Sequence, residues 1–116
     1  MANTYIISRV DTDQRIRAIN WLNDHDFYSK TGIKQTDVYY CFDRKDKAIF
    51  VRGLGIDAFI DDRPDVLMCM DNKVDKILFN PYAGDMETYK NDIEINNMLI
   101  VRDWNRIGEY FGVIKE

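Results

Sequence analysis

The sequence contains few of the residues that build metal centres and disulfide frameworks. Among its 116 residues there are two cysteines and one histidine. Neither Cys41 nor Cys69 has another cysteine or a histidine at the spacing of a metal site, so we interpret both as small buried apolar residues. His25 lies in a polar run that is typical of a helix end, and we interpret it as a solvated cap residue.

Long apolar runs and a surplus of positive charge are also missing. No apolar run approaches the roughly 20 residues that a membrane helix needs, and residues 4–10 are too few and too polar for a signal peptide. The 16 basic side chains are outnumbered by 20 acidic ones, whereas non-specific nucleic-acid binding needs an excess of Lys and Arg on one face. The sequence therefore predicts a soluble, cytoplasmic protein without a membrane or a non-specific nucleic-acid partner.

What the sequence does contain is enough for one domain. Apolar residues make up 46% of the chain and charged residues 31%. A folded chain of this size buries roughly two-thirds of the surface that its unfolded form exposes, which suffices for a single hydrophobic core. We therefore expect one domain over residues 1–116, with no room for a second.

Short apolar segments alternate with segments of helical periodicity. We predict strands over the β-branched and aromatic runs, at residues 4–10, 37–42, 56–60, 76–79 and 98–101. We predict helices where apolar residues recur at helical spacing, at residues 14–25, from the charged turn 43–47 to residue 54, at 64–70, and from Trp104 through Ile107, Tyr110 and Phe111. The polar tract 85–97 is predicted to be a mobile loop. This alternation predicts an α/β fold, with a mostly parallel sheet and helices on both faces.

Ligands of such sheets bind beyond the carboxyl ends of the strands. The residues at those ends offer a hydroxyl, several cations and several carboxylates, and they lie at 8–13, 43–47, 61–65 and 80–82. The adjacent carboxylates of Asp61 and Asp62 raise one another's pKa unless a divalent cation, Arg63 or Lys47 offsets their charge. Taken alone, the pair is typical of a turn and helix cap before Pro64.

The order of these residues resembles the haloacid dehalogenase-like hydrolase superfamily, and most of all its nucleotidase and polynucleotide phosphatase branches. In that superfamily a Ser or Thr follows one strand, a Lys comes next along the chain, and an acidic pair, often continuing as Asp-Asp-Arg, follows a later strand. The residues that carry the resemblance cover nearly the whole chain; they are Ser8-Arg9, Trp21-Leu22, Lys47, Ala58-Phe59-Ile60, Asp61-Asp62-Arg63-Pro64, residues 77–82 and residues 101–105.

The resemblance implies a single haloacid dehalogenase-like domain, with a truncated three-layer Rossmann-like sheet and no cap domain. It implies that Ser8 and Lys47 hold the oxygens of a phosphoryl group, and that the Asp61-Asp62 pair helps to hold Mg²⁺, which offsets the charge of that group. We add Arg9 and Arg63 to the expected phosphate-binding residues. The expected ligand is a phosphorylated small molecule or a nucleotide.

One motif of the superfamily is missing. Its first motif is an Asp-x-Asp sequence upstream of the Ser or Thr, in which the first Asp is the nucleophile and the second is the general acid and base. Residues 1–7, which precede Ser8, contain no Asp. We therefore expect a catalytically impaired protein that keeps a phosphate or nucleotide binding role.

Two alternatives stay open: an active Mg²⁺-dependent phosphatase or nucleotidase, and a purely structural or interaction module. In the first, the nucleophile is Asp11 or Asp13, which form an Asp-x-Asp sequence after the first strand, or it comes from a partner chain. We favour a helix-cap role for Asp11 and Asp13, because a helix follows them directly. In the second, Asp61 and Asp62 form only a turn and a cap.

The missing motif would also remove a central strand, between the strands that end at Val10 and Ile60. Exposed edges of buried strands attract other strands. We expect either that these two strands pair directly, or that a partner chain or a second copy completes the sheet.

Aromatic residues near the strand ends are candidates for stacking on a base. They are Tyr39, Tyr40 and Tyr82. We favour core packing for Tyr39 and Tyr40 and leave both roles open for Tyr82. The aromatic residues of the last predicted helix are expected to pack it on the sheet or to form an oligomer interface.

Overall fold

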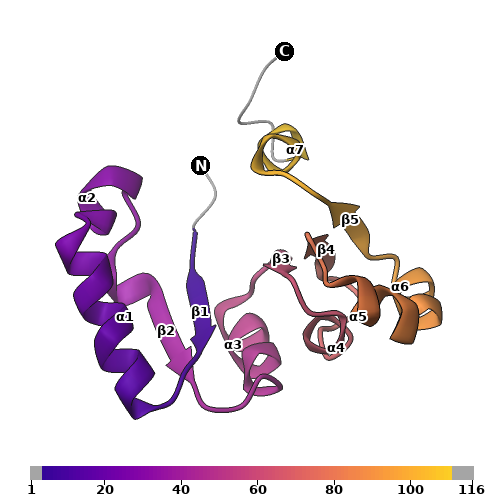
Figure 1. The fold of residues 1–116 in the computed structure, drawn as a ribbon, viewed down its shortest axis with the longest axis horizontal. Helices are drawn as coiled ribbons and strands as arrows, with labels where there is room; N and C mark the ends of the chain where they lie inside the picture. The colour runs from indigo at the N-terminus through magenta and orange to yellow at the C-terminus, as the bar shows by residue number, and fades with distance from the viewer. Residues whose placement is uncertain (1–3, 111–116) are drawn as a thin grey trace. The chain divides into compact units, whose positions relative to one another are not determined.

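The chain folds as an α/β protein in which short parallel strands alternate with helices (Figure 1). The computed structural model describes residues 4–110. The chain divides into two units, Met1–Phe50 and Val51–Glu116, and each has its own parallel sheet. The predicted α/β class and the parallel direction of the strands are therefore confirmed, and the units are described in turn.

The sheet of the first unit has two parallel strands, β1 (Ile6–Arg9) and β2 (Val38–Cys41). The chain between them forms helices α1 (Thr12–Asp24) and α2 (Phe27–Thr31) and a short 3₁₀ helix, η1 (Gln35–Asp37). A parallel pair needs such a crossover, because the chain must return to the end where the first strand began.

Helix α1 begins at a complete capping box. The Asp11 carboxylate accepts a hydrogen bond from the backbone N–H of Gln14 at 2.7 Å, and the Gln14 side chain accepts one from the Asp11 N–H at 2.9 Å. These bonds satisfy donors that a helix N-terminus otherwise leaves unpaired. The helix ends at His25, its exposed C-cap residue. The cap interpretations of Asp11 and His25 are both confirmed.

Helices cover both faces of the β1–β2 pair. Side chains alternate between the faces along a strand. On one face, the strand residues that lie toward α1 are Ile6, Ser8, Val38 and Tyr40. On the other face, the ring of Tyr39 packs against Phe50 of α3 (Asp46–Leu54), with 5.4 Å between ring centroids.

Burial in the first unit is sparse. Ile7 and Cys41 are the buried apolar side chains among its described residues, and α1 contributes no buried residue. Ile16 and Trp21 of that helix are large apolar residues and stay exposed. Helix α1 therefore rests on the sheet without closing over it.

The sheet of the second unit has three parallel strands in the order β3–β4–β5. Their bounds are Ala58–Asp61, Asp75–Phe79 and Leu99–Val101. The helices of this unit, besides the end of α3, are α4 (Pro64–Leu67), α5 (Ala83–Thr88), α6 (Lys90–Ile95) and α7 (Trp104–Tyr110).

The central strand β4 divides the core of the second unit in two. Leu78 points to one face, where it packs with Leu67, Ile93 and Met98, and its neighbour Ile77 points to the other face. There Ile77 packs with Val101 and with Ile107 of α7. Helices thus cover both faces of this sheet, and three layers are present in the second unit.

Two interactions fix the loop that leads into β4. Lys76 is buried, and its ammonium donates hydrogen bonds to the backbone oxygens of Asp71 at 3.0 Å and Val74 at 3.2 Å. Arg52 binds the Asp71 carboxylate through two hydrogen bonds, of 3.0 and 3.2 Å. A buried ammonium is costly unless it is hydrogen-bonded, so these carbonyls make the burial of Lys76 tolerable.

The prediction of a mobile loop over 85–97 is wrong. Residues of this tract form the end of α5 and all of α6. Ile93 is buried in the core, and Met86 and Tyr89 pack against the same cluster. The tract has few apolar residues, but Met86 of α5, Ile93 of α6 and Tyr89 at the junction of the two helices all reach this cluster.

Three other expectations change or fall outside the description. Cys41 is buried as expected, but Cys69 is exposed; it lies one turn beyond Asp65, and its thiol donates to the Asp65 carbonyl at 3.4 Å. The helix predicted over 64–70 is shorter, since α4 ends at Leu67. Phe111 lies outside the described residues.

The helices were also compared with the needs of a membrane span. Within residues 4–110, no helix is both long and apolar enough to cross a bilayer.

Replacing a core leucine of β4 tests the second unit. Leu78 is fully buried, so Leu78→Ala should lower the free energy of unfolding by about 2–5 kcal/mol through lost burial and the cavity left behind. Leu99→Ala is the matched control, because Leu99 on strand β5 is 44% exposed and should cost clearly less. Urea unfolding measures both, and equal losses for the two variants would contradict this core.

Candidate functional site

The first unit gathers three of the expected phosphate-binding residues at the carboxyl ends of its strands. Ser8 and Arg9 end β1, and Lys47 lies in the first turn of α3, after β2. The thiol of Cys41 lies 3.7 Å from the backbone oxygen of Ser8. Arg9 and Lys47 both lie close enough to this thiol to act on its ionisation.

The electrostatics around Cys41 report on this group of charges. Burial raises the pKa of the Cys41 thiol, and the positive charge of Lys47 opposes the rise. Asp46 adds to the rise, Arg9 opposes it, and Asp43 adds to it again. The strand ends of the first unit therefore carry two cations beside two carboxylates, with Ser8 next to them.

Asp11 and Asp13 follow these strand ends. The carboxylate of Asp11 is engaged in the capping box of α1. Asp13 lies in the first turn of α1, where a carboxylate interacts favourably with the helix dipole. Both positions are explained by the start of the helix.

In the second unit, the acidic pair follows β3 as the sequence predicts. Asp61 is 9% exposed, and its carboxylate accepts a hydrogen bond from the backbone N–H of Arg63 at 3.0 Å. Asp62 is exposed. The two neighbouring carboxylates therefore differ, because Asp61 is built into the turn and Asp62 faces solvent.

Arg63 was expected to offset the charge of the Asp61-Asp62 pair, but its guanidinium forms an ion pair with Asp65. Its guanidinium binds Asp65 at both ends, with Nε–Oδ1 at 3.1 Å and Nη2–Oδ2 at 3.0 Å. The hydrogen bond to Asp65 raises the pKa of Arg63, while burial opposes the rise. A ligand phosphate would have to compete with Asp65 for this side chain.

The described residues offer no preformed metal cage. Within residues 4–110, no three His, Cys, Asp or Glu side chains come together at metal-binding distances. Magnesium, however, is usually held by one or two carboxylates together with substrate phosphates. The expectation that Asp61 and Asp62 help to hold Mg²⁺ therefore stays a prediction.

The ends of β4 and β5 carry exposed aromatic rings. Tyr82 is 74% exposed, and its ring lies so close to Gly84 that a Cβ there would approach it to 2.6 Å. Trp104 is exposed too, and its ring packs on Phe79 with 4.6 Å between centroids. Tyr39 is half-buried and its ring lies against those of Tyr5 and Phe50, which agrees with the packing role that we favour.

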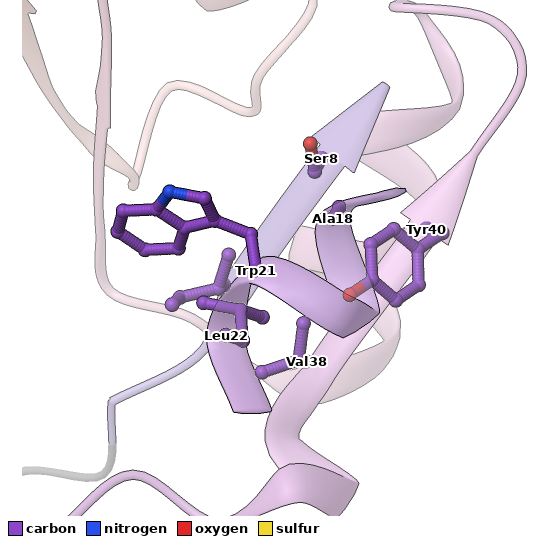
Figure 2. A pocket seen from close by; sticks show the side chains of 7 residues that line it. Ser8, Ala18, Trp21, Leu22, Val38 and Tyr40 are labelled. Atoms are coloured by element: carbon purple, nitrogen blue, oxygen red, sulfur yellow. The ribbon is translucent and has the colours of Figure 1, made fainter. Parts of the chain in front are cut away.

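A cavity of the first unit was missed by the sequence reasoning. It has a volume of about 280 Å³ and lies between α1 and the β1–β2 pair. Its lining residues are Ile6, Ser8, Ala18, Trp21, Leu22, Val38 and Tyr40. Figure 2 shows Trp21 and Leu22 reaching it from α1, and Val38 and Tyr40 from β2. A signal was present, since Ala18 is a small residue within the apolar stripe of α1.

Comparisons with protein-family models, with curated proteins and with solved structures give no match to this chain. The resemblance described above therefore depends on the motif residues themselves.

The thiols test the electrostatics of the first unit. Cys69 is exposed and should react quickly with iodoacetamide at neutral pH. Cys41 should react much more slowly, because it is buried and its raised pKa leaves less thiolate than an ordinary cysteine has. Mass spectrometry of the labelled peptides measures both rates, and Cys69→Ser should remove only the fast reaction. Fast labelling of Cys41 in the folded protein would refute this environment.

Proposed function

We propose that this chain is a haloacid dehalogenase-like phosphatase-fold protein that binds a phosphorylated small molecule or nucleotide and does not hydrolyse it unaided. The observation that supports this most is the group at the strand ends of the first unit. There the charges of Arg9 and Lys47 act on the Cys41 thiol, which lies against the backbone oxygen of Ser8, at the end of a sheet where ligands of parallel sheets bind.

The chemistry of this group suits a phosphate. A hydroxyl donates one hydrogen bond, and an ammonium and a guanidinium donate charge-assisted ones, which are the stronger kind. Asp43 and Asp46 lie near the same thiol and reduce the positive potential. Binding should therefore be selective for a ligand that satisfies the donors directly, and it should weaken as salt screens the charges.

The second unit supplies the carboxylates expected for Mg²⁺. Asp62 is exposed and Asp61 is fixed by the Arg63 N–H, so Asp62 would reach the ion most easily. In the superfamily that the sequence resembles, Mg²⁺ offsets negative charge on a phosphoryl group.

Hydrolysis in this superfamily requires a nucleophilic carboxylate, and the three residues of the strand-end group supply none. Asp11, which follows them, is engaged in capping α1. These residues therefore support binding more directly than turnover.

The second candidate is an active Mg²⁺-dependent phosphatase or nucleotidase whose nucleophile is Asp11, Asp13 or a residue of a partner chain. One observation favours the partner. Among the described residues of the first unit, β1 pairs only with β2. Among those of the second unit, β3 pairs only with β4. Each strand therefore keeps one edge that a strand from a partner or a second copy would extend.

Phosphate titration tests the proposal. Inorganic phosphate should bind the purified chain, and Lys47→Ala should weaken it roughly tenfold or more, as expected for the loss of a charge-assisted hydrogen bond of about 1.5–3 kcal/mol. Lys45→Ala is the matched control, because Lys45 is an exposed lysine in the same segment. Calorimetry and thermal shift measure binding.

The outcomes separate the candidates. No stabilisation by phosphate, nucleotide or Mg²⁺ would overturn the proposal in favour of a structural or interaction module. Hydrolysis of 4-nitrophenyl phosphate that is lost in Asp11→Asn or Asp13→Asn would replace it with the active enzyme.

The acidic pair can be divided by substitution. Asp61→Ala should destabilise the chain by about 1–3 kcal/mol, because it leaves the Arg63 N–H without its acceptor. Asp62→Ala should leave stability nearly unchanged, because Asp62 is exposed, but should weaken Mg²⁺ binding in the presence of phosphate. Urea unfolding and Mg²⁺ titration measure the two effects, and unchanged Mg²⁺ affinity in Asp62→Ala would refute its role as a ligand.

A further inference from the structure

The cavity between α1 and the β1–β2 pair has the size of a small-molecule site. Its volume of about 280 Å³ is close to the lower end of the usual range for ligand pockets, about 300–1,000 Å³. It lies wholly within the first unit, whose few buried side chains leave this space unfilled.

The lining of the cavity selects the kind of group that it accepts. None of the seven described residues that line it is charged. A phosphate or an ammonium placed there would lose its hydration without a charged partner among the lining residues, which is costly. The occupant is therefore an uncharged and largely apolar group.

Trp21 favours a flat occupant. Its indole lines the cavity and is nevertheless 55% exposed, so it is available for stacking. His25 stacks on the same ring, with 4.1 Å between centroids and 20° between planes, which restricts the orientation of the indole. Offset stacking on such a held ring stabilises an aromatic group more than an aliphatic one of similar size.

Ser8 connects the cavity to the strand-end group. It lines the cavity together with Tyr40, which lies opposite it in the sheet. Its backbone oxygen lies against the Cys41 thiol, on which the charges of Arg9 and Lys47 act. A ligand whose phosphate is held by the Ser8 hydroxyl therefore has an uncharged cavity next to its phosphate.

We infer that this cavity binds the aromatic ring of the phosphorylated ligand, so that the ligands of the chain are aromatic phosphate esters rather than aliphatic ones. This inference rests on the proposed phosphate-binding function. It assigns Trp21 and Leu22 of α1 to recognition of the ring, in place of the tyrosines that the sequence suggested.

Four small probes separate the ring from the phosphate: phenyl phosphate, ethyl phosphate, phenol and inorganic phosphate. Trp104→Phe provides the background, because it leaves Trp21 as the one tryptophan of the chain. Phenyl phosphate should change the Trp21 fluorescence and bind about tenfold more tightly than ethyl phosphate, in line with a ring-stacking contribution of about 1–3 kcal/mol.

Filling the cavity should remove this preference. Ala18→Leu adds bulk at a lining position, so phenyl phosphate should bind no better than ethyl phosphate, whose affinity stays the same. Asn20→Leu is the control, since Asn20 lies on the same helix, is exposed and does not line the cavity. Trp21→Ala is a second variant that should also remove the preference if Ala18→Leu disturbs folding; its binding is measured by calorimetry, because the substitution removes the fluorophore.

The outcomes distinguish the two levels of the argument. Equal affinity for phenyl and ethyl phosphate in the background protein would overturn the ring site and leave the phosphate-binding function standing. A preference that persists in both Ala18→Leu and Trp21→Ala would overturn the cavity as its location. Binding of phenol without binding of any phosphate would overturn the proposed function and, with it, the aromatic phosphate ligand.

Discussion

A parallel strand must be covered on both faces, and the two units meet this requirement to different degrees. In the second unit, Ile77 and Leu78 of β4 enter separate buried clusters on opposite sides of the sheet. In the first unit, α3 packs on one face through Phe50, but α1 covers the other face without burying a residue. The cavity, the exposed Trp21 and the half-buried Ser8 all follow from this incomplete cover.

The difference in how completely the two sheets are covered also applies to the candidate site residues. Asp61 is fixed by the backbone of a turn that leads into a buried helix, so it is part of the fold. Ser8 lies beside α1, which buries no residue, so a ligand there would add packing that this face lacks. A ligand that binds only the folded state stabilises that state by mass action. Because the first unit buries few side chains, its stability should gain the most from a bound ligand.

Helices and strands with a regular pattern of apolar residues were predicted correctly from the sequence. The predictions were wrong where the structure depends on the packing of a few side chains. The strands were predicted correctly because runs of β-branched and aromatic residues strongly favour strand over helix. The start of α1 was predicted correctly because Asp11 is a typical N-cap residue. Helix α6 was missed because one buried residue, Ile93, carries most of its packing. Cys69 was misjudged because the early end of α4 turns it outward. The cavity depends on how tightly α1 rests on its sheet, which periodicity does not encode. The motif residues of the candidate site lie at or after the carboxyl ends of strands, as the sequence predicts. Their chemistry stays a prediction.

The loop that leads into β4 has two anchors that respond differently to acid. The hydrogen bond from Arg52 lowers the pKa of the Asp71 carboxyl, so this pair contributes stability above the unfolded pKa of Asp71 and loses it as the pH falls through the lower folded value. The pair is well exposed, and its share is small. Lys76, in contrast, holds neutral backbone oxygens, which have no proton to gain over this range. The hydrogen bonds of Lys76 therefore still hold the loop before β4 at a pH where the Arg52–Asp71 ion pair has already been lost.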